Sequence, residues 1–416
     1  MPTIFFVFLV ILLQRANTNM IQSINPLFVK YVLDVNLVYI GVTTATYAVS
    51  TLLVRYLLSI RVKPQLISRF IIAGLILFSF AIFGYFISTS FPEFLIFVIL
   101  SGFATAIIMP FLLSLVHLVS DKADVEKNLT VYSLMLSLAL VFGPLLGSAL
   151  LSVLSIRYIY LMLCGFGITA FFFALKINKT AKNILTERIK KEQMNATAKN
   201  EETLGNDESG SGKIQKGGSI ARLFKNYGFL EVIFYNTAFS ISFASIVAFG
   251  GVYAKDNFHI EYFEITLLFA LFFISSLIVR LGLLYFTKKG AIKNKTEILN
   301  ISIFLASLSF IFMVLSKGIF FYALSLILLG IPHALIFPIG TMKISEAVGT
   351  NDIVAANTIY QSNFDLGGII GPFFLAYLGE AYGIRFVFII IALFLFLSFI
   401  AGRLMQRNKT KAVKAL

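Results

Sequence analysis

The sequence predicts an all-α membrane protein of twelve transmembrane helices, built as two related six-helix halves. Of its 416 residues, 58% are hydrophobic and 13% are charged, whereas soluble domains are about 45–50% apolar and about 25% charged. The apolar residues form runs of about 20, the length that crosses the hydrocarbon core of a bilayer as a helix. The distribution of basic residues and an internal repeat then divide these runs into two halves.

Twelve runs are expected to span the membrane. They are residues 4–32, 36–59, 67–88, 93–119, 129–153, 155–175, 227–254, 262–286, 296–316, 319–345, 351–379 and 383–405. The first run has no basic residue before it and no small-residue cleavage site after it, so we expect a membrane span rather than a signal peptide.

The chain divides into four parts on composition. Residues 1–175 and 227–405 each hold six spans and are predicted to form the N-terminal and C-terminal six-helix bundles. Residues 176–226 are rich in Lys, Glu, Asn, Gly and Ser, which cannot bury enough apolar surface to fold, and we predict a flexible cytoplasmic linker. Residues 406–416 are predicted to form a basic cytoplasmic tail.

The net charge of +14 is explained by membrane topology rather than by nucleic acid. Lys and Arg accumulate on cytoplasmic loops of membrane proteins. With the N-terminus inside, the linker, the tail and the other inner segments hold most of the basic residues. The outer loops hold only Lys30, Arg157, Lys255, Lys317 and Arg385. We therefore predict a multi-pass protein of the plasma (inner) membrane with both termini in the cytoplasm.

Residues that would support a metal site, a cofactor or catalysis are scarce. Cys164 is the only cysteine and the three histidines are scattered, so the sequence indicates neither an internal disulfide nor a metal-ligand cluster. No glycine-rich phosphate-binding loop is present, which argues against ATP as the energy source. We expect no cofactor and no enzymatic activity.

An internal repeat relates the two halves. Segment 50–55 matches segment 275–280 at an offset of 225 residues, and both end in an arginine. After a three-residue insertion the offset becomes 228, at which Gly143-Pro144 matches Gly371-Pro372. Six plus six spans in the same orientation is a parallel repeat, related by an axis along the membrane normal.

These features together resemble the major facilitator superfamily of secondary transporters. The resemblance covers nearly the whole chain, with 6 + 6 spans and a long basic central loop. The segment Gly143–Ser148 resembles the second half of the Gly-Pro motif of antiporters in that superfamily, and Tyr382–Phe388 resembles its G-W-R-x-x-F step into the last span. The chain departs from the family in segment 59–64, which lacks the usual aspartate of the loop after span two, and in span four, which lacks an arginine.

Polar residues inside spans give the candidate substrate site. A charge inside a bilayer is costly and usually functional, and Arg15 and Asp365 lie at similar depths near the middle of their spans. Helical spacing places Asn19 and Gln22 on one stripe with Arg15, and Gln361 on one stripe with Asp365, and a polar stripe does not face lipid. His333 lies at a similar depth in span ten, and span seven adds Asn236. The resemblance implies that these spans line a central cavity. The candidate substrate-binding residues are Arg15, Asn19, Gln22, Asn236, His333, Gln361 and Asp365.

Arg15 and Asp365 are also the candidate coupling residues. Asp365 can exchange a proton as the site alternates between the two sides of the membrane, and Arg15 can set the charge of the substrate. A static ion pair between helices is the alternative for both residues.

A second group of residues is assigned to gating or structure. Arg55 and Arg280 lie one to two turns from the inner ends of spans two and eight, where long side chains can reach the interface. The Gly-Pro pairs, Gly143 with Pro144 and Gly371 with Pro372, are expected to bend and closely pack spans five and eleven.

The leading functional hypothesis is secondary active transport of a small organic solute by alternating access, as proton-coupled efflux. The first alternative is an uptake carrier, a symporter or uniporter, for a polar or anionic metabolite, because Arg15 can hold a carboxylate or phosphate. The second is a non-transporting membrane sensor or scaffold. The expected partners are the solute, protons or another ion, and membrane lipids, for a protein that acts as a monomer.

Overall fold

The computed structural model describes residues 2–58, 66–120, 124–178, 222–348 and 353–415. Most of the predicted linker, residues 179–221, lies outside the described residues. The described chain contains twelve long helices. They are α1 (Pro2–Tyr31), α2 (Leu37–Leu58), α3 (Ile67–Ile87), α4 (Phe91–Val119), α5 (Val125–Leu151), the helix Ile156–Asn178, α8 (Tyr227–Phe258), α9 (Tyr262–Lys288), α10 (Lys295–Leu315), α11 (Ile319–Ala347), α12 (Ile353–Tyr382) and α13 (Ile384–Ala415).

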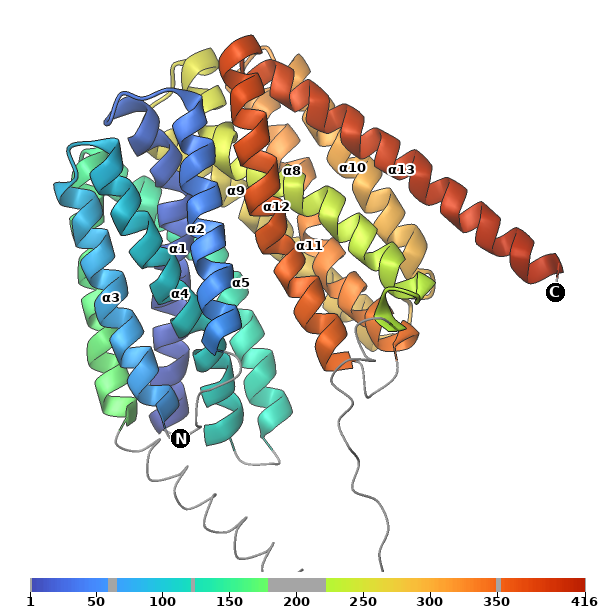
Figure 1. Ribbon diagram of the computed structural model, residues 1–416, viewed down its shortest axis with the longest axis horizontal. Helices are drawn as coiled ribbons and strands as arrows, with labels where there is room; N and C mark the ends of the chain where they lie inside the picture. Colours follow the sequence, from blue (N-terminus) through green and yellow to red (C-terminus); the bar gives the residue numbers. More distant parts are fainter. Residues whose placement is uncertain (1, 59–65, 121–123, 179–221, 349–352, 416) are drawn as a thin grey trace, which may run out of the picture.

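The helices form two bundles that stand side by side (Figure 1). The N-terminal half, drawn in blue to green, holds α1 to α5 and the helix Ile156–Asn178, and the C-terminal half holds α8 to α13. We call the end at which α1 and α12 begin the linker end, and the opposite end the far end. The most extensive contacts between the halves join α2 to α12 and α5 to α9.

Two sets of close helix contacts repeat in the two halves. A Cβ atom on Gly143 of α5 would lie 2.6 Å from the carbonyl oxygen of Ala16 on α1, and one on Gly371 of α12 would lie 2.7 Å from that of Ile241 on α8. The offset is 228 for the glycines and 225 for the residues they face, as the sequence repeat requires. Only a residue without Cβ permits these helices to pack so closely.

The same correspondence holds for α2 with α4 and for α9 with α11. A Cβ on Gly102 would lie 2.8 Å from Cβ of Ser50, and one on Gly330 would lie 2.8 Å from Cβ of Ser275. Both pairs keep the offsets of 228 and 225. The two halves are therefore equivalent in their packing as well as in their sequence.

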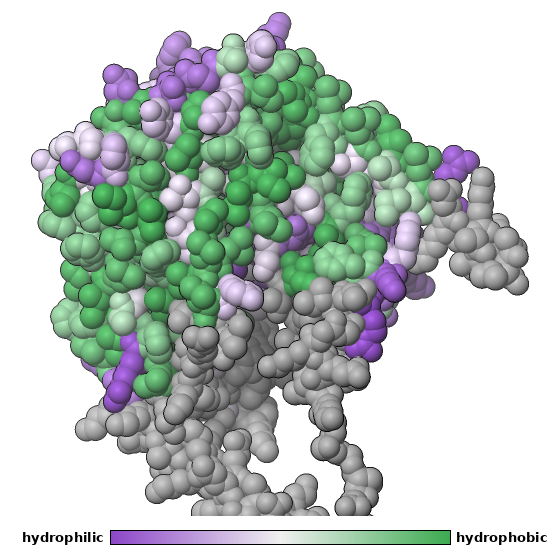
Figure 2. Space-filling model, viewed as in Figure 1, coloured by the Kyte–Doolittle hydropathy of each residue, from purple (hydrophilic) through white to green (hydrophobic). Residues whose placement is uncertain are grey.

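The helices of both halves expose large apolar side chains, and we call this surface the apolar belt. Figure 2 shows hydrophobic surface over the middle of one face, with hydrophilic residues gathered at the top and along the lower edge. Among the described residues, eleven helices are long and apolar enough to span a membrane, and α12, which carries Asp365, is the twelfth long helix. Large apolar side chains such as Phe80, Phe320 and Leu397 are exposed on this surface. The chain is a multi-pass membrane protein.

The helix bounds agree with the predicted spans to within a few residues at most ends. The last helix differs, because α13 continues from Ile384 to Ala415, through the segment predicted as a tail. Its extension is rich in Lys and Arg, and Figure 1 shows it running away from the bundle.

Polar contacts join the two halves at the far end. The hydroxyl of Tyr31 on α1 donates a hydrogen bond to Oδ1 of Asp256 on α8, at 2.6 Å. The backbone N–H of Leu37, at the start of α2, donates to Oε2 of Glu380 on α12, at 2.8 Å. These contacts hold the far ends of α1 and α2 against the C-terminal half.

Candidate functional site

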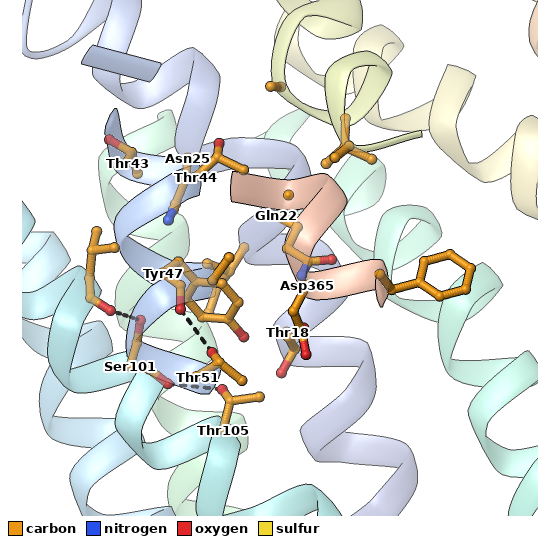
Figure 3. Close-up of a pocket in the computed structure, with 18 of the residues that line it drawn as sticks. Thr18, Gln22, Asn25, Thr43, Thr44, Tyr47, Thr51, Ser101, Thr105 and Asp365 are labelled. Carbon is orange, nitrogen blue, oxygen red and sulfur yellow. Dashed lines mark hydrogen bonds between the residues drawn. The ribbon is translucent and has the colours of Figure 1, made fainter. Parts of the chain in front are cut away.

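A cavity lies between the two halves and is lined by α1, α2, α4 and one residue of α3 on one side and by α8 and α12 on the other. Its volume is about 260 Å³, slightly below the roughly 300–1,000 Å³ that ligand pockets commonly measure, so in this conformation it admits only a compact solute. Figure 3 shows Thr18, Gln22 and Asp365 gathered on one side of the ring of Tyr47.

The two walls of the cavity differ in chemistry. The N-terminal half presents mainly hydroxyl and amide groups. They are Thr18, Gln22, Asn25, Thr43, Thr44, Tyr47, Thr51, Ser101 and Thr105. The wall from α8 is mainly apolar, with Phe243, Val247 and Ala248, and α12 adds Phe364 beside Asp365. The cavity therefore offers hydrogen bonds on one side and an apolar surface on the other.

An ion pair crosses from one half to the other at this cavity. Nη1 of Arg55 on α2 lies 2.6 Å from Oδ2 of Asp365 on α12, and both residues line the cavity. Their side chains are 34% and 21% exposed, so the pair is half-buried and reachable from the cavity. The position of Arg55 near the end of its span predicts a side chain that reaches the membrane–water interface. In the structure, the side chain instead contacts the carboxylate of Asp365.

The equivalent contact, in which the arginine comes from the C-terminal half, joins α9 to α5. Nη1 of Arg280 donates a hydrogen bond to Oγ of Ser137 at 3.4 Å. Arg280 is the repeat partner of Arg55, and Ser137 is the repeat partner of Asp365, since 365 exceeds 137 by 228. The structure thus contains two equivalent contacts between the halves, and only one of them has a carboxylate.

Arg15 of α1 also lines the cavity, but it is not paired with Asp365. Among the described residues, its guanidinium takes part in no ion pair and no hydrogen bond. The groups that interact with it electrostatically are Asp365, Arg55, Arg280 and the phenols of Tyr47 and Tyr132.

The other candidates from the sequence lie in different environments. Gln22 lines the cavity, whereas Asn19 is buried away from it, with its Nδ2 atom unpaired. Asn236 is fully buried and donates from Nδ2 to the carbonyl of Tyr360, which ties α8 to α12. Gln361 is exposed on α12 and does not line the cavity.

His333 lies in an aromatic environment behind the cavity wall. Its Nδ1 atom lies 2.8 Å from Oγ of Ser276 on α9. The rings of Phe239, Phe243 and Phe272 surround it, with centroids between 4.7 and 6.3 Å away. The histidine is a hydrogen-bonded core residue in this conformation, because it does not line the cavity.

The polar wall contributed by α2 was not predicted from the sequence. Thr44, Tyr47, Thr51 and Arg55 follow one another at spacings of three or four residues, which places them on one stripe of the helix. Arg55 is among the gating candidates predicted from the sequence, whereas the other three are not. Hydroxyls within a helix commonly bond to the carbonyl four residues earlier, as those of Thr44 and Thr51 do, so they give only a weak sequence signal for a site. In the structure, all four residues line the cavity.

Comparison with solved structures finds the same fold in many chains, of which three are representative. The nucleoside transporter NupG has a TM-score of 0.77 at 14% identity, with 97% of this chain and 99% of that chain covered. The peptide transporter POT in complex with sulfate has a TM-score of 0.76 at 13% identity, with 98% and 94% covered. A bacterial homolog of the human lysosomal transporter Spinster, inward-facing and unoccupied, has a TM-score of 0.73 at 13% identity, with 98% and 97% covered.

Sequence comparison identifies the family. Curated protein sequences give no significant match. The family profile described as Major Facilitator Superfamily, in contrast, matches residues 7–369 and 233–415, which together cover nearly the whole chain. The fold, the repeated halves and the profile agree, and the chain belongs to the Major Facilitator Superfamily.

Proposed function

We propose that this protein is a secondary active transporter that moves a small organic solute by alternating access and couples the movement to protons. The observation that carries the proposal is the ion pair between Arg55 and Asp365. It joins the two halves, it lines the solute-sized cavity, and one of its members can take up a proton. Solved structures named as nucleoside and peptide transporters share the fold.

The proposed coupling follows from the charge of Asp365. The carboxylate attracts Arg55 only while it is ionised, so a proton on Asp365 removes the attraction between α2 and α12. The groups that act on Asp365 from neighbouring helices are Arg55 of α2 and Arg15 of α1, with Tyr47 of α2 nearby. Protonation therefore frees Arg55, weakens the contact between the halves, and favours a change in the side from which the cavity is open.

Export in exchange for protons is the direction we propose first. Its support is the resemblance of Gly143-Pro144 to the motif of antiporters, and in the structure this glycine packs directly on α1. Uptake together with a proton is the second candidate, and one observation favours it. A proton on Asp365 releases Arg55 within the cavity, where the guanidinium can then bind the solute while the proton remains bound.

We also propose that the protein lies in the plasma membrane with its linker end, and so both termini, in the cytoplasm. The concentration of Lys and Arg at that end supports this orientation. Lipid contacts would then be made by the exposed apolar belt.

The function is tested by proton flux in proteoliposomes that contain a pH-sensitive dye, challenged with organic cations, anions and neutral solutes. We expect one class of solute to move protons through the wild-type protein, and Asp365→Asn to move the same solute without protons. The matched control is Asp34→Asn, which removes an exposed carboxylate in the loop between α1 and α2. If Asp365→Asn keeps the full proton flux, the coupling assigned to Asp365 is wrong. If no solute crosses, a sensor or scaffold replaces the transporter.

A further inference from the structure

The charges at the cavity do not balance. Arg15, Arg55 and Asp365 line it, and Arg280 of α9, outside the lining, interacts electrostatically with Arg15. In the described part of the chain, Asp365 is the only acidic residue of the lining, and it forms its ion pair with Arg55. One carboxylate thus faces two guanidinium groups in the lining, and a third, that of Arg280, adds positive charge near Arg15.

The guanidinium groups of Arg15 and Arg280 have no anionic partner among the residues that the structure describes. Arg280 makes its hydrogen bond to a neutral hydroxyl, that of Ser137, and its Nε atom is buried without a partner. Arg15 has no ion pair within the described residues, and it lies close enough to Arg280 for the two charges to repel each other. A charge that is removed from bulk water without a counter-charge is costly, so buried charges are normally paired.

We propose that the missing counter-charge is the substrate, a small organic anion whose carboxylate or phosphate group binds Arg15 in the positive field of Arg280. A guanidinium matches the geometry of either group, because it can donate two parallel hydrogen bonds to two oxygens. This inference rests on the proposed function only for the claim that the anion is carried; the binding itself is a separate property.

The rest of the cavity defines the remainder of the ligand. The hydroxyl and amide side chains of α1 and α2, which include Thr18 and Gln22, can bind polar atoms next to the charged group. On the opposite wall, Phe243 and Val247 of α8 offer an apolar surface. The cavity volume of about 260 Å³ limits the ligand to a compact molecule. The expected substrate therefore has an anionic group, a polar edge and an apolar face.

Thermal unfolding of the purified protein in detergent tests the binding without requiring transport. The probes are benzoate with benzamide, phenyl phosphate with phenol, benzyltrimethylammonium as a cation, and inorganic phosphate, all at constant ionic strength. We expect benzoate or phenyl phosphate to raise the melting temperature, because a ligand that binds only the folded state stabilises it. The neutral partners and the cation are expected to have no such effect.

Substitutions locate the site. We expect Arg15→Gln to raise the dissociation constant for the anion at least tenfold. Arg15→Lys and Arg280→Gln should each raise it by a smaller factor. Arg69→Gln is the matched control, since Arg69 is exposed on α3 and does not line the cavity. Removing an uncompensated charge should also make Arg15→Gln at least as stable as the wild type when no anion is added.

The outcomes separate this inference from the proposed function. If no anionic probe stabilises the wild type more than Arg15→Gln, or if the cation stabilises it equally, the inference is wrong, even where proton-coupled flux of another solute is observed. If anions bind through Arg15 but no solute crosses the membrane, the site stands and the transport proposal fails.

Discussion

Arg55 with Asp365 and Arg280 with Ser137 are two equivalent contacts in a repeated structure, and they differ by one carboxyl group. Both arginines extend from the same position of the repeat to the opposite half of the protein. One meets a carboxylate at 2.6 Å and the other a hydroxyl at 3.4 Å. The comparison indicates that the repeat supplies the scaffold, whereas the chemistry of coupling is concentrated on one side.

The walls of the cavity show the same division. The equivalent glycine contacts, Gly143 on Ala16 and Gly371 on Ile241, keep the two halves alike in packing. The cavity itself is polar on α1 and α2 and largely apolar on α8. Symmetry in the helix contacts therefore coexists with asymmetry in the side chains that face the solute.

Removing the arginine from each contact should give the largest difference between them. Arg55→Gln leaves Asp365 without its ion-pair partner, and we expect proton-driven solute flux at saturating solute to fall at least tenfold. Arg280→Gln removes only a bond to a hydroxyl, so we expect it to change the apparent solute affinity while the proton flux at saturation stays within a few-fold of the wild type. Equal losses in proton flux for the two variants would contradict the asymmetry.

Moving the carboxylate to the other contact is the next test. Asp365→Ser alone should abolish coupling, and combining it with Ser137→Asp places the acid opposite Arg280. We expect the double variant to recover proton-coupled flux to roughly a tenth of the wild-type rate or more, because the two positions are related by the repeat. If the double variant is as inactive as Asp365→Ser, pairing an acid with the equivalent arginine is not sufficient for coupling, and the two positions are not functionally equivalent.

Filling the equivalent glycine contacts tests the symmetry of the scaffold. In Gly143→Ala and in Gly371→Ala the new Cβ would meet a backbone carbonyl oxygen of the facing helix. Overpacking of this kind costs about 1–3 kcal/mol, and we expect both variants to lower the melting temperature in detergent by similar amounts. Gly165→Ala is the control, because open space surrounds that position. Destabilisation by only one of the pair would contradict equivalent packing.

The far-end contact is expected to give the smallest effect. Tyr31→Phe removes the hydrogen bond to Asp256; such a bond contributes up to about 1.5–3 kcal/mol when its acceptor is charged, and this one is exposed to solvent, which reduces its contribution. We expect a shift of several-fold toward the state open at the far end, measured as faster alkylation of a cysteine introduced at the cavity in a Cys164→Ser background. Tyr377→Phe, at an exposed tyrosine on α12, should leave the rate unchanged.

The fold could be predicted almost completely from the sequence. The lengths of the apolar runs indicate the membrane spans, and the offsets of the repeat relate the two halves. Gly143 and Gly371 match at a fixed offset in the sequence, and they make equivalent contacts with α1 and α8 in the structure. The end of α13 was missed, since a helix can continue beyond the membrane once its residues become charged, and hydropathy reports only the apolar part.

The sequence predicts which candidate residues lie near the middle of the membrane, but not which residues contact one another. Arg15, Gln22 and Asp365 were selected by depth and stripe, and they line the cavity. The same reasoning gave no information about which helix faces which, so the partner of Asp365 was not identified as Arg55. Asn236 and His333 were predicted to bind substrate but do not line the cavity. Each forms a hydrogen bond between two packed helices instead, which is the other common role of a polar side chain in a span.

The measurement that tests the central claim most directly is the distance between the two halves as a function of pH. Spin labels at Leu57→Cys on α2 and Tyr285→Cys on α9, both exposed positions near the linker end, report that distance in a Cys164→Ser background. We expect a distance distribution that changes between high and low pH in the wild type. We also expect Asp365→Asn to show the low-pH distribution at every pH. A distribution that does not respond to pH, or one that responds equally in Asp365→Asn, would contradict the claim that a proton on Asp365 releases Arg55 and lets the halves move.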